Sequence, residues 1–236
     1  MSVFSSSVKS QIIDPVFSSN SRCEFRLANR GESYLPTMKI GNLGLSTSGN
    51  DTTYHFGPGA CSVINRIQLL DGNEPIDTLR NVGQWLTFKN SLHSNSQNDN
   101  VFNKMVGGSL GWATGSTGEL LSNDNKLINQ EGSAETLGTL DLREVFPFLN
   151  SVSSVSTKLF KNLRVVIEYN TKKIALVNSQ VTDTFTKTLP ILMVDEIIDE
   201  ALAASLDKQM QSAQWTAIET DTVSVPQVPG ITDAGA

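Results

Sequence analysis

The feature that most constrains the fold is a two-residue alternation of apolar and polar side chains, which recurs in short segments along the chain. Successive side chains of a β-strand point to opposite faces, so this alternation predicts half-buried strands. It is clearest in residues 158–170, where one face would collect Leu163, Val165, Ile167 and Tyr169. Residues 22–28 show the same pattern. In all we count about eight strand candidates separated by turn-forming residues.

Strands punctuated by turns, with helices inserted into the connections, predict an all-β fold. Eight strands in two Greek-key sheets form a jelly roll, so we expect an eight-stranded jelly-roll β-sandwich with inserted helices and a long Gly/Ser/Asn-rich loop. The composition agrees with this fold class. Charged residues make up only 18% of the chain, and serine, threonine, asparagine and glycine, which favour turns, take their place.

The pattern divides the 236 residues into three parts. Serine-rich residues 1–21 are weakly patterned and predict an N-terminal arm. Residues 22–212 form the predicted jelly-roll domain, interrupted at residues 93–135 by a long loop of the kind that is often functional. Residues 213–236 are expected to be an extended C-terminal segment or a linker to a second jelly roll.

Two helices are expected within the domain. The first covers residues 75–92, because Asn73 can cap it, Pro75 suits an early helical position, and apolar residues follow at spacings of three and four. The second covers residues 194–211, with Asp195 as its cap and acidic residues in its first turn. Its predicted apolar stripe consists of Ile198, Ala201, Leu202, Ser205 and Leu206.

The charge and the apolar runs exclude several function classes. The formal net charge is -6 and the pI is about 4.9, whereas a nucleic-acid interface needs clustered positive charge, so no direct nucleic-acid contact is expected. The sequence has no stretch of 18 apolar residues and no apolar signal-peptide core, so we expect no membrane-spanning segment and no secretion. Cys23 and Cys61 are interpreted as small buried hydrophobic residues in a reducing compartment, and whether they pair is left open.

One motif resembles a catalytic site. Gly107, Ser109 and Gly111 match the GxSxG pattern of serine hydrolases, which needs a strand before the serine, a helix after it and a histidine later in the chain. The residues that follow are too rich in glycine to open a helix, and both histidines, His55 and His93, come earlier. The motif therefore indicates a glycine-serine loop.

The remaining candidates for chemistry are weaker. With two histidines and no CxxC, HExxH or calcium-loop spacing, we expect no metal site. No glycine-rich phosphate loop follows a strand, so no cofactor is expected. The sequence predicts no catalytic residue and a protein that is not an enzyme.

Three segments of the chain together resemble a known family. They are "INRIQLLDGNEPIDTLRNVGQWLTFKNSL" (64–92), "TLDLREVFPFLNSVSSVSTKLFKNLRVVIEY" (139–169) and "PILMVDEIID" (190–199). Their pattern and order are similar to the first jelly roll and linker of the double-jelly-roll major capsid proteins of double-stranded DNA viruses, in the polinton-like and virophage-type branch. The likeness covers about residues 22–228 and includes a short aromatic turn, with Phe146 and Phe148, that leads into a long strand.

This resemblance implies a structural capsid protein located in the virion and assembled inside the host cell. It implies a hexon-type subunit that forms a homotrimer and contacts neighbouring capsomers and minor capsid proteins in an icosahedral shell. Phe146, Phe148, Trp112 and Trp215 are the candidate packing or interface residues. Two jelly rolls need a longer chain than this, so a single-jelly-roll penton or minor capsid protein remains an alternative. A non-viral β-sandwich that binds carbohydrate or protein is another.

Overall fold

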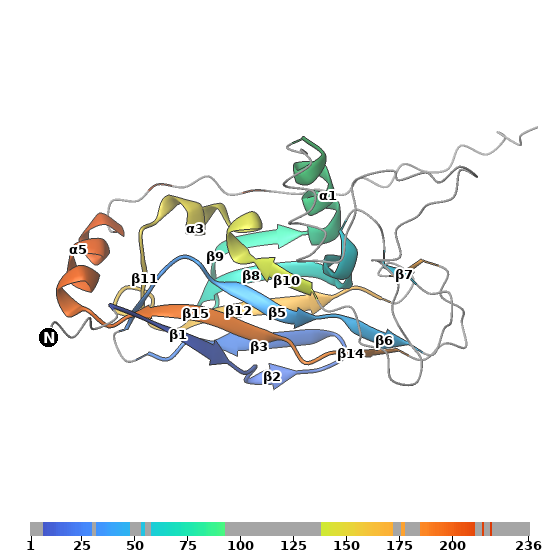
Figure 1. The fold of residues 1–236 in the computed structure, drawn as a ribbon, viewed down its shortest axis with the longest axis horizontal. Coiled ribbons are helices and arrows are strands. Elements are labelled where there is room, and N and C mark those ends of the chain that lie inside the picture. Colours follow the sequence, from blue (N-terminus) through green and yellow to red (C-terminus); the bar gives the residue numbers. More distant parts are fainter. Residues whose placement is uncertain are drawn as a thin grey trace, which may run out of the picture.

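Two antiparallel sheets face each other and enclose one hydrophobic core (Figure 1). The computed structural model describes the following residues: 7–29, 32–47, 53–54, 58–92, 138–171, 176–177, 185–210, 214 and 218. The long-loop region, both histidines, Trp112, Trp215 and Ser109 lie outside these residues, so the predictions made for them stay predictions.

The first sheet contains β1 (Val8–Ile13), β15 (Ile191–Ile197), β5 (Lys39–Leu43), β10 (Gly138–Asp141), β4 (Ser33–Tyr34) and β11 (Val155–Ser156). The second sheet contains β2 (Phe17–Ser18), β3 (Arg22–Arg26), β12 (Leu163–Tyr169), β8 (Ile64–Asp71) and β9 (Glu74–Arg80). Two small ladders join β6 (Leu45–Thr47) to β14 (Phe185–Lys187) and β7 (Thr53–Tyr54) to β13 (Leu176–Val177).

The pairing of the strands defines the topology. In the described part of the chain, the eight strands of four or more residues are, in chain order, β1, β3, β5, β8, β9, β10, β12 and β15. The first of these pairs with the eighth, the second with the seventh, the third with the sixth and the fourth with the fifth, all antiparallel. This nested pairing is the jelly-roll order. The predicted fold class is therefore confirmed by the chain's own strand register.

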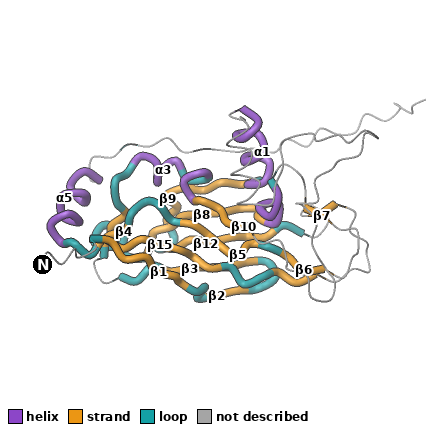
Figure 2. The backbone as a smooth tube through the Cα atoms, viewed as in Figure 1, coloured by secondary structure: helices purple, strands orange, loops and turns teal. Residues whose placement is uncertain are grey.

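Helices lie along one edge and at the ends of the sandwich (Figure 2). In the described residues the α-helices are α1 (Val82–Leu92), α3 (Pro147–Ser151) and α5 (Glu200–Met210), and short 3-10 turns occur as η1 (Gly59–Val63) and η2 (Leu142–Glu144). The core between the sheets is built from the alternating apolar residues of both, among them Phe25, Ile40, Ile67, Val165, Ile167 and Leu192.

The first predicted helix was wrong in its first half. Residues 75–80 belong to strand β9, which forms a hairpin with β8 around Gly72, whose φ of +62° favours glycine. Pro75 is tolerated because β9 is an edge strand and the ladder shifts register opposite Leu69 and Leu70. The apolar spacing that suggested a helix is satisfied instead by pairing with β8, and the helix begins only at Val82.

The predicted N-terminal arm was also wrong over part of its length. Strand β1 pairs with β15 along its full six residues, from Val8 opposite Ile197 to Ile13 opposite Leu192. Three of its six residues are exposed and three are partly buried, so the burial pattern that marks an internal strand is weak here. The strand forms because β15 offers an unpaired edge, and nothing local in the sequence signals this.

The second predicted helix starts later than expected. Val194 to Ile197 complete strand β15, and the helix is capped by Asp199, whose Oδ1 accepts from the backbone N–H groups of Ala201 and Leu202 at 2.9 and 3.1 Å. The predicted cap, Asp195, instead accepts hydrogen bonds from the hydroxyls of Ser10 on β1 and of Thr37 between β4 and β5. The predicted apolar stripe was wrong as well, because α5 buries Ala203, Asp207 and Met210.

Candidate functional site

The segment from Thr139 to Val152 closes one edge of the sandwich with an ordered turn. Asp141, the last residue of β10, accepts from the backbone N–H of Arg143 at 3.0 Å and from its guanidinium Nη2 at 2.6 Å. Burial alone would raise the pKa of Asp141, but the hydrogen bonds and charge of Arg143 outweigh it and lower that pKa. The pair therefore orders the turn η2 at the rim of the core.

Two phenylalanines of this segment point inward. Phe146 is fully buried and Phe148 is 1% exposed, and the Phe148 ring packs edge-to-face on Phe160 with the centroids 5.7 Å apart. Asp77 of β9, itself buried, accepts from the backbone N–H of Phe148 at 3.2 Å, in the first turn of α3. Strand β9 thus holds the short helix by its N-terminus, and the two rings seal the core below it.

Helix α1 is fastened to the same turn. Trp85 donates its indole N–H to the carbonyl of Glu144 at 3.1 Å, and Lys89 forms a 2.6 Å ion pair with the Glu144 carboxylate. These contacts join the helix that precedes the long loop to the strand segment that follows it. The segment is a packing and docking element, with its charged residues at the surface and its rings inside.

A buried carboxylate joins α5 to the first sheet. Asp207 accepts from three serine hydroxyls, those of Ser33 at 3.0 Å, Ser156 at 3.1 Å and Ser154 at 3.4 Å. All three serines are buried, and they come from β4, β11 and the residue before β11. A buried charge is tolerated only where hydrogen bonds replace its hydration. The cluster explains why α5 turns its acidic face, rather than the predicted apolar stripe, toward the sheet.

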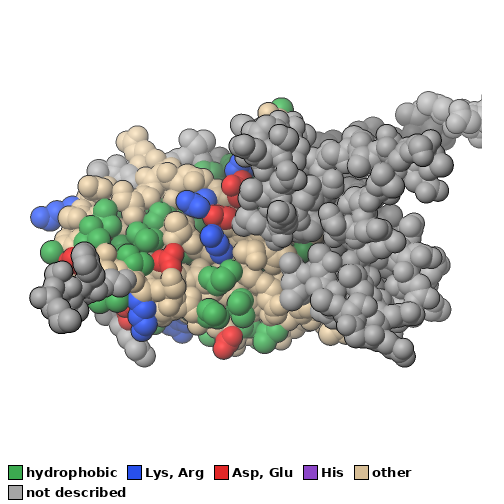
Figure 3. All heavy atoms as spheres, viewed as in Figure 1, with side chains coloured by type: hydrophobic (Ala, Val, Ile, Leu, Met, Phe, Trp, Pro, Cys, Tyr) green, Lys and Arg blue, Asp and Glu red, His purple; other side chains and the backbone are tan. Residues whose placement is uncertain are grey.

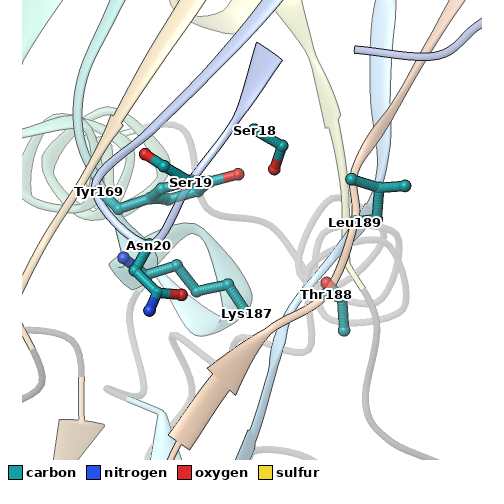
Figure 4. Close-up of a pocket in the computed structure, with 7 residues that line it drawn as sticks. All are labelled: Ser18, Ser19, Asn20, Tyr169, Lys187, Thr188 and Leu189. Atoms are coloured by element: carbon teal, nitrogen blue, oxygen red, sulfur yellow. The ribbon is translucent and has the colours of Figure 1, made fainter. Parts of the chain in front are cut away.

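A pocket opens between the β2–β3 turn, the end of β12 and the segment that follows β14 (Figure 4). Its volume is about 350 Å³, and its lining residues are Ser18, Ser19, Asn20, Tyr169, Lys187, Thr188 and Leu189. Lys187 runs from β14 toward Tyr169, and its Nζ lies 4.3 Å from the centroid of that ring. Burial lowers the pKa of Lys187 to about 8. Sequence reasoning missed this site, because its residues come from segments far apart in the chain.

The two cysteine thiols are buried and free, so the question left open by the sequence is answered: they do not pair. Burial raises the pKa of Cys23 to about 11, although hydrogen bonds with Tyr169 and Ser18 oppose the shift. Burial alone raises the pKa of Cys61 to about 12. Both thiols stay protonated near neutral pH, which makes them poor nucleophiles. Cys61 lies in the 3-10 turn η1.

Exposed apolar residues gather at the β1–β2 edge. Ile12, Val16 and Phe17 are 66%, 62% and 51% exposed, and hydrophobic side chains are visible over these strands in Figure 3. We call these three residues the β1–β2 patch. Contiguous apolar residues on a surface mark an interaction site more often than isolated ones do.

The described part of the structure offers neither a cluster of metal ligands nor a helix that could cross a membrane. Its histidine, cysteine and acidic side chains form no group of three that could hold a metal ion. None of its helices combines the length and the apolar character needed to cross a membrane.

The strand register defines the chain as an all-β protein with a jelly-roll sandwich. Neither a protein-family model nor a curated protein sequence matches it. Among solved structures it is similar to VP54 of PBCV-1, fitted into a reconstruction of the virophage Sputnik, with 12% identity and a TM-score of 0.49 over 87% of this chain and 46% of that one. It is also similar to the Faustovirus major capsid protein, with 8% identity and a TM-score of 0.48 over 86% of this chain and 56% of that one.

A third solved structure, the mavirus major capsid protein, has 11% identity and a TM-score of 0.34 over 80% of this chain and 46% of that one. The chain spans about half the length of each of these three proteins.

Proposed function

We propose that the chain is a structural subunit of a viral capsid, and that it forms the first jelly roll of a hexon-type major capsid protein. One observation carries the proposal. The three sequence segments that resemble the major capsid family are the segments that build β8, β9, β10, β12 and β15, five of the eight strands of the jelly roll. The resemblance therefore follows the strands that make the fold. The proposed role is structural and needs no catalytic residue.

The proposed partners are two further copies of the chain, neighbouring capsomers and minor capsid proteins. A shell subunit needs a rigid sandwich and surfaces that match in every copy. The β1–β2 patch supports self-association, because it exposes three apolar side chains on β1, on β2 and on the bend between them. We further propose that residues 213–236 form an extended segment leading toward a second jelly roll, and that Trp112 and Trp215 contribute to subunit contacts.

The mass of the purified full chain in solution tests this function. Light scattering coupled to size exclusion, over a hundredfold range of concentration, should give a species of three times the 25.6 kDa chain mass. Electron microscopy of concentrated samples should then show regular capsomer-like particles. A monomer at every concentration, together with binding to a glycan panel, would instead support the β-sandwich binding module.

A pair of matched variants locates the contact surface. Phe17→Asp places a charge in the β1–β2 patch, whereas Leu159→Asp places the same charge at an exposed apolar residue outside it. We expect Phe17→Asp to be monomeric with an unchanged far-ultraviolet circular dichroism spectrum. We expect Leu159→Asp to form the same oligomer as the parent protein. Equal behaviour of the two variants would remove the patch from the proposal.

A further inference from the structure

Among the described residues that line the pocket beside β14, there is one ionisable amine and no acidic side chain. Lys187 is the only charged residue of the pocket lining, in which the other residues are uncharged. Among the residues that the structure describes, no carboxylate forms an ion pair with this lysine. An ammonium group that loses water without gaining an anion is disfavoured relative to the neutral amine.

The Tyr169 ring offers only partial compensation. Its face attracts a cation, and the 4.3 Å separation from the Lys187 Nζ is suited to that attraction. The ring supplies no hydrogen-bond acceptor of the strength of water, however, and burial dominates, which leaves the Lys187 pKa at about 8. At pH 7 about a tenth of this side chain is therefore the free amine.

Several other polar groups of the pocket are already engaged in hydrogen bonds. The Thr188 hydroxyl lies 2.5 Å from the carbonyl of Asn42 and 3.1 Å from that of Gly44, and Ser19 caps its own turn at Arg22. The Tyr169 hydroxyl is hydrogen-bonded with the thiol of Cys23. None of these groups needs the lysine as a partner, so the amine is left facing the cavity (Figure 4).

We propose that Lys187 is a covalent capture site for small aldehydes, which enter the pocket and form an imine with its amine. The volume of about 350 Å³ admits a molecule with a single aromatic ring, and the Leu189 side chain and the Tyr169 ring supply apolar surface for it. A desolvated lysine in a cavity is the usual setting for Schiff-base chemistry.

The step balances without any added oxidant or reductant. The Nζ lone pair attacks the carbonyl carbon, the carbon–oxygen π bond breaks, and a proton moves from nitrogen to oxygen to give a carbinolamine. Loss of the hydroxyl as water forms the carbon–nitrogen double bond. Because only the neutral amine attacks, the rate follows the free fraction of Lys187. An ordinary lysine has a pKa of about 10.4, so at pH 7 the neutral fraction of Lys187 is roughly a hundredfold higher than that of an ordinary lysine.

The experiment uses the full-length protein and benzaldehyde. Brief exposure at pH 7 with cyanoborohydride traps each imine as a benzylamine, and peptide mass spectrometry reports the labelled lysines. Lower basicity also lowers nucleophilicity, so we expect Lys187 to be labelled about tenfold faster than Lys161, an exposed lysine on a turn. The rate at Lys187 should rise with pH and level off above about pH 8, whereas equal labelling of the two lysines would overturn the proposal.

Two variants separate the cavity from the amine. Leu189→Trp narrows the pocket while leaving the lysine in place, and it should slow labelling at Lys187 without affecting Lys161. Lys187→Arg should abolish labelling at that position only. Unaltered labelling of Lys187 in the narrowed pocket, in a protein with an unchanged melting temperature, would show that the cavity does not admit the aldehyde and would refute the assignment.

Discussion

Removal of the Phe148 ring is the most direct test of the segment that closes the sandwich. The side chain is 1% exposed and packs edge-to-face on Phe160 with the centroids 5.7 Å apart. Phe148→Ala removes a fully buried ring and leaves a cavity, so we expect the free energy of unfolding to fall by about 3–5 kcal/mol. Of this loss, roughly 0.5–1.5 kcal/mol belongs to the ring pair. Phe146→Ala should cost about as much, because that ring is also fully buried.

Urea denaturation followed by fluorescence measures the loss, and a double-mutant cycle with Phe160→Ala isolates the contribution of the ring pair. The matched control is Phe88→Ala on α1, where the ring is 56% exposed and the change should cost less than about 1 kcal/mol. Equal destabilisation by Phe148→Ala and Phe88→Ala, with unchanged oligomer size in both, would show that the segment does not seal the core.

Three further predictions follow from other buried or strained positions. Asp207→Ala leaves its serine partners without a carboxylate, so we expect a loss of about 2–3 kcal/mol and faster hydrogen exchange in α5; unchanged exchange would contradict the docking role. Burial raises the pKa of Asp77, and hydrogen bonds from the backbone N–H groups of Phe148 and Thr78 only partly oppose this shift. The folded pKa of Asp77 therefore exceeds its unfolded pKa. Its contribution to the free energy of unfolding falls as pH rises from about 4 through the folded pKa. Asp77→Asn should remove this pH dependence from the urea midpoints measured between pH 3.5 and 6. The same pH dependence in the parent and in the variant would contradict the prediction. Gly72→Ala, at a φ of +62°, should cost about 1–2 kcal/mol by thermal unfolding, and a neutral result would mean that the turn relaxes.

Much of the fold could be predicted because alternation is a local signal. Residues 22–28 and 158–170 alternate cleanly, and the structure forms β3 and β12 there as neighbouring strands. The short aromatic turn with Phe146 and Phe148 was expected from the family resemblance, and no local pattern was used to derive it. In that turn the rings are buried and the Asp141–Arg143 pair lies at the rim.

Residues 75–80 show where local pattern fails. Their apolar spacing fits a helix and a strand almost equally well. A strand forms because β8 pairs with these residues, with one register shift between Leu69 and Leu70. The Asp71-Gly72 pair is a strong hairpin signal, and reading it as a turn between two strands would have found β9. Strand β1 carried no comparable signal, since its partner residues lie 179 to 189 positions away in the sequence.

The sequence by itself determined the fold class, the approximate strands and the closing segment, because alternation and turn residues depend only on neighbours along the chain. Tertiary structure decided which face of α5 is buried, since three serines from separate segments meet Asp207 only after the sheet has formed. It also decided the environment of Lys187, whose amine loses water because β2, β12 and β14 converge around it. Burial and pairing between distant segments are properties of the assembled sandwich, and no local pattern encodes them.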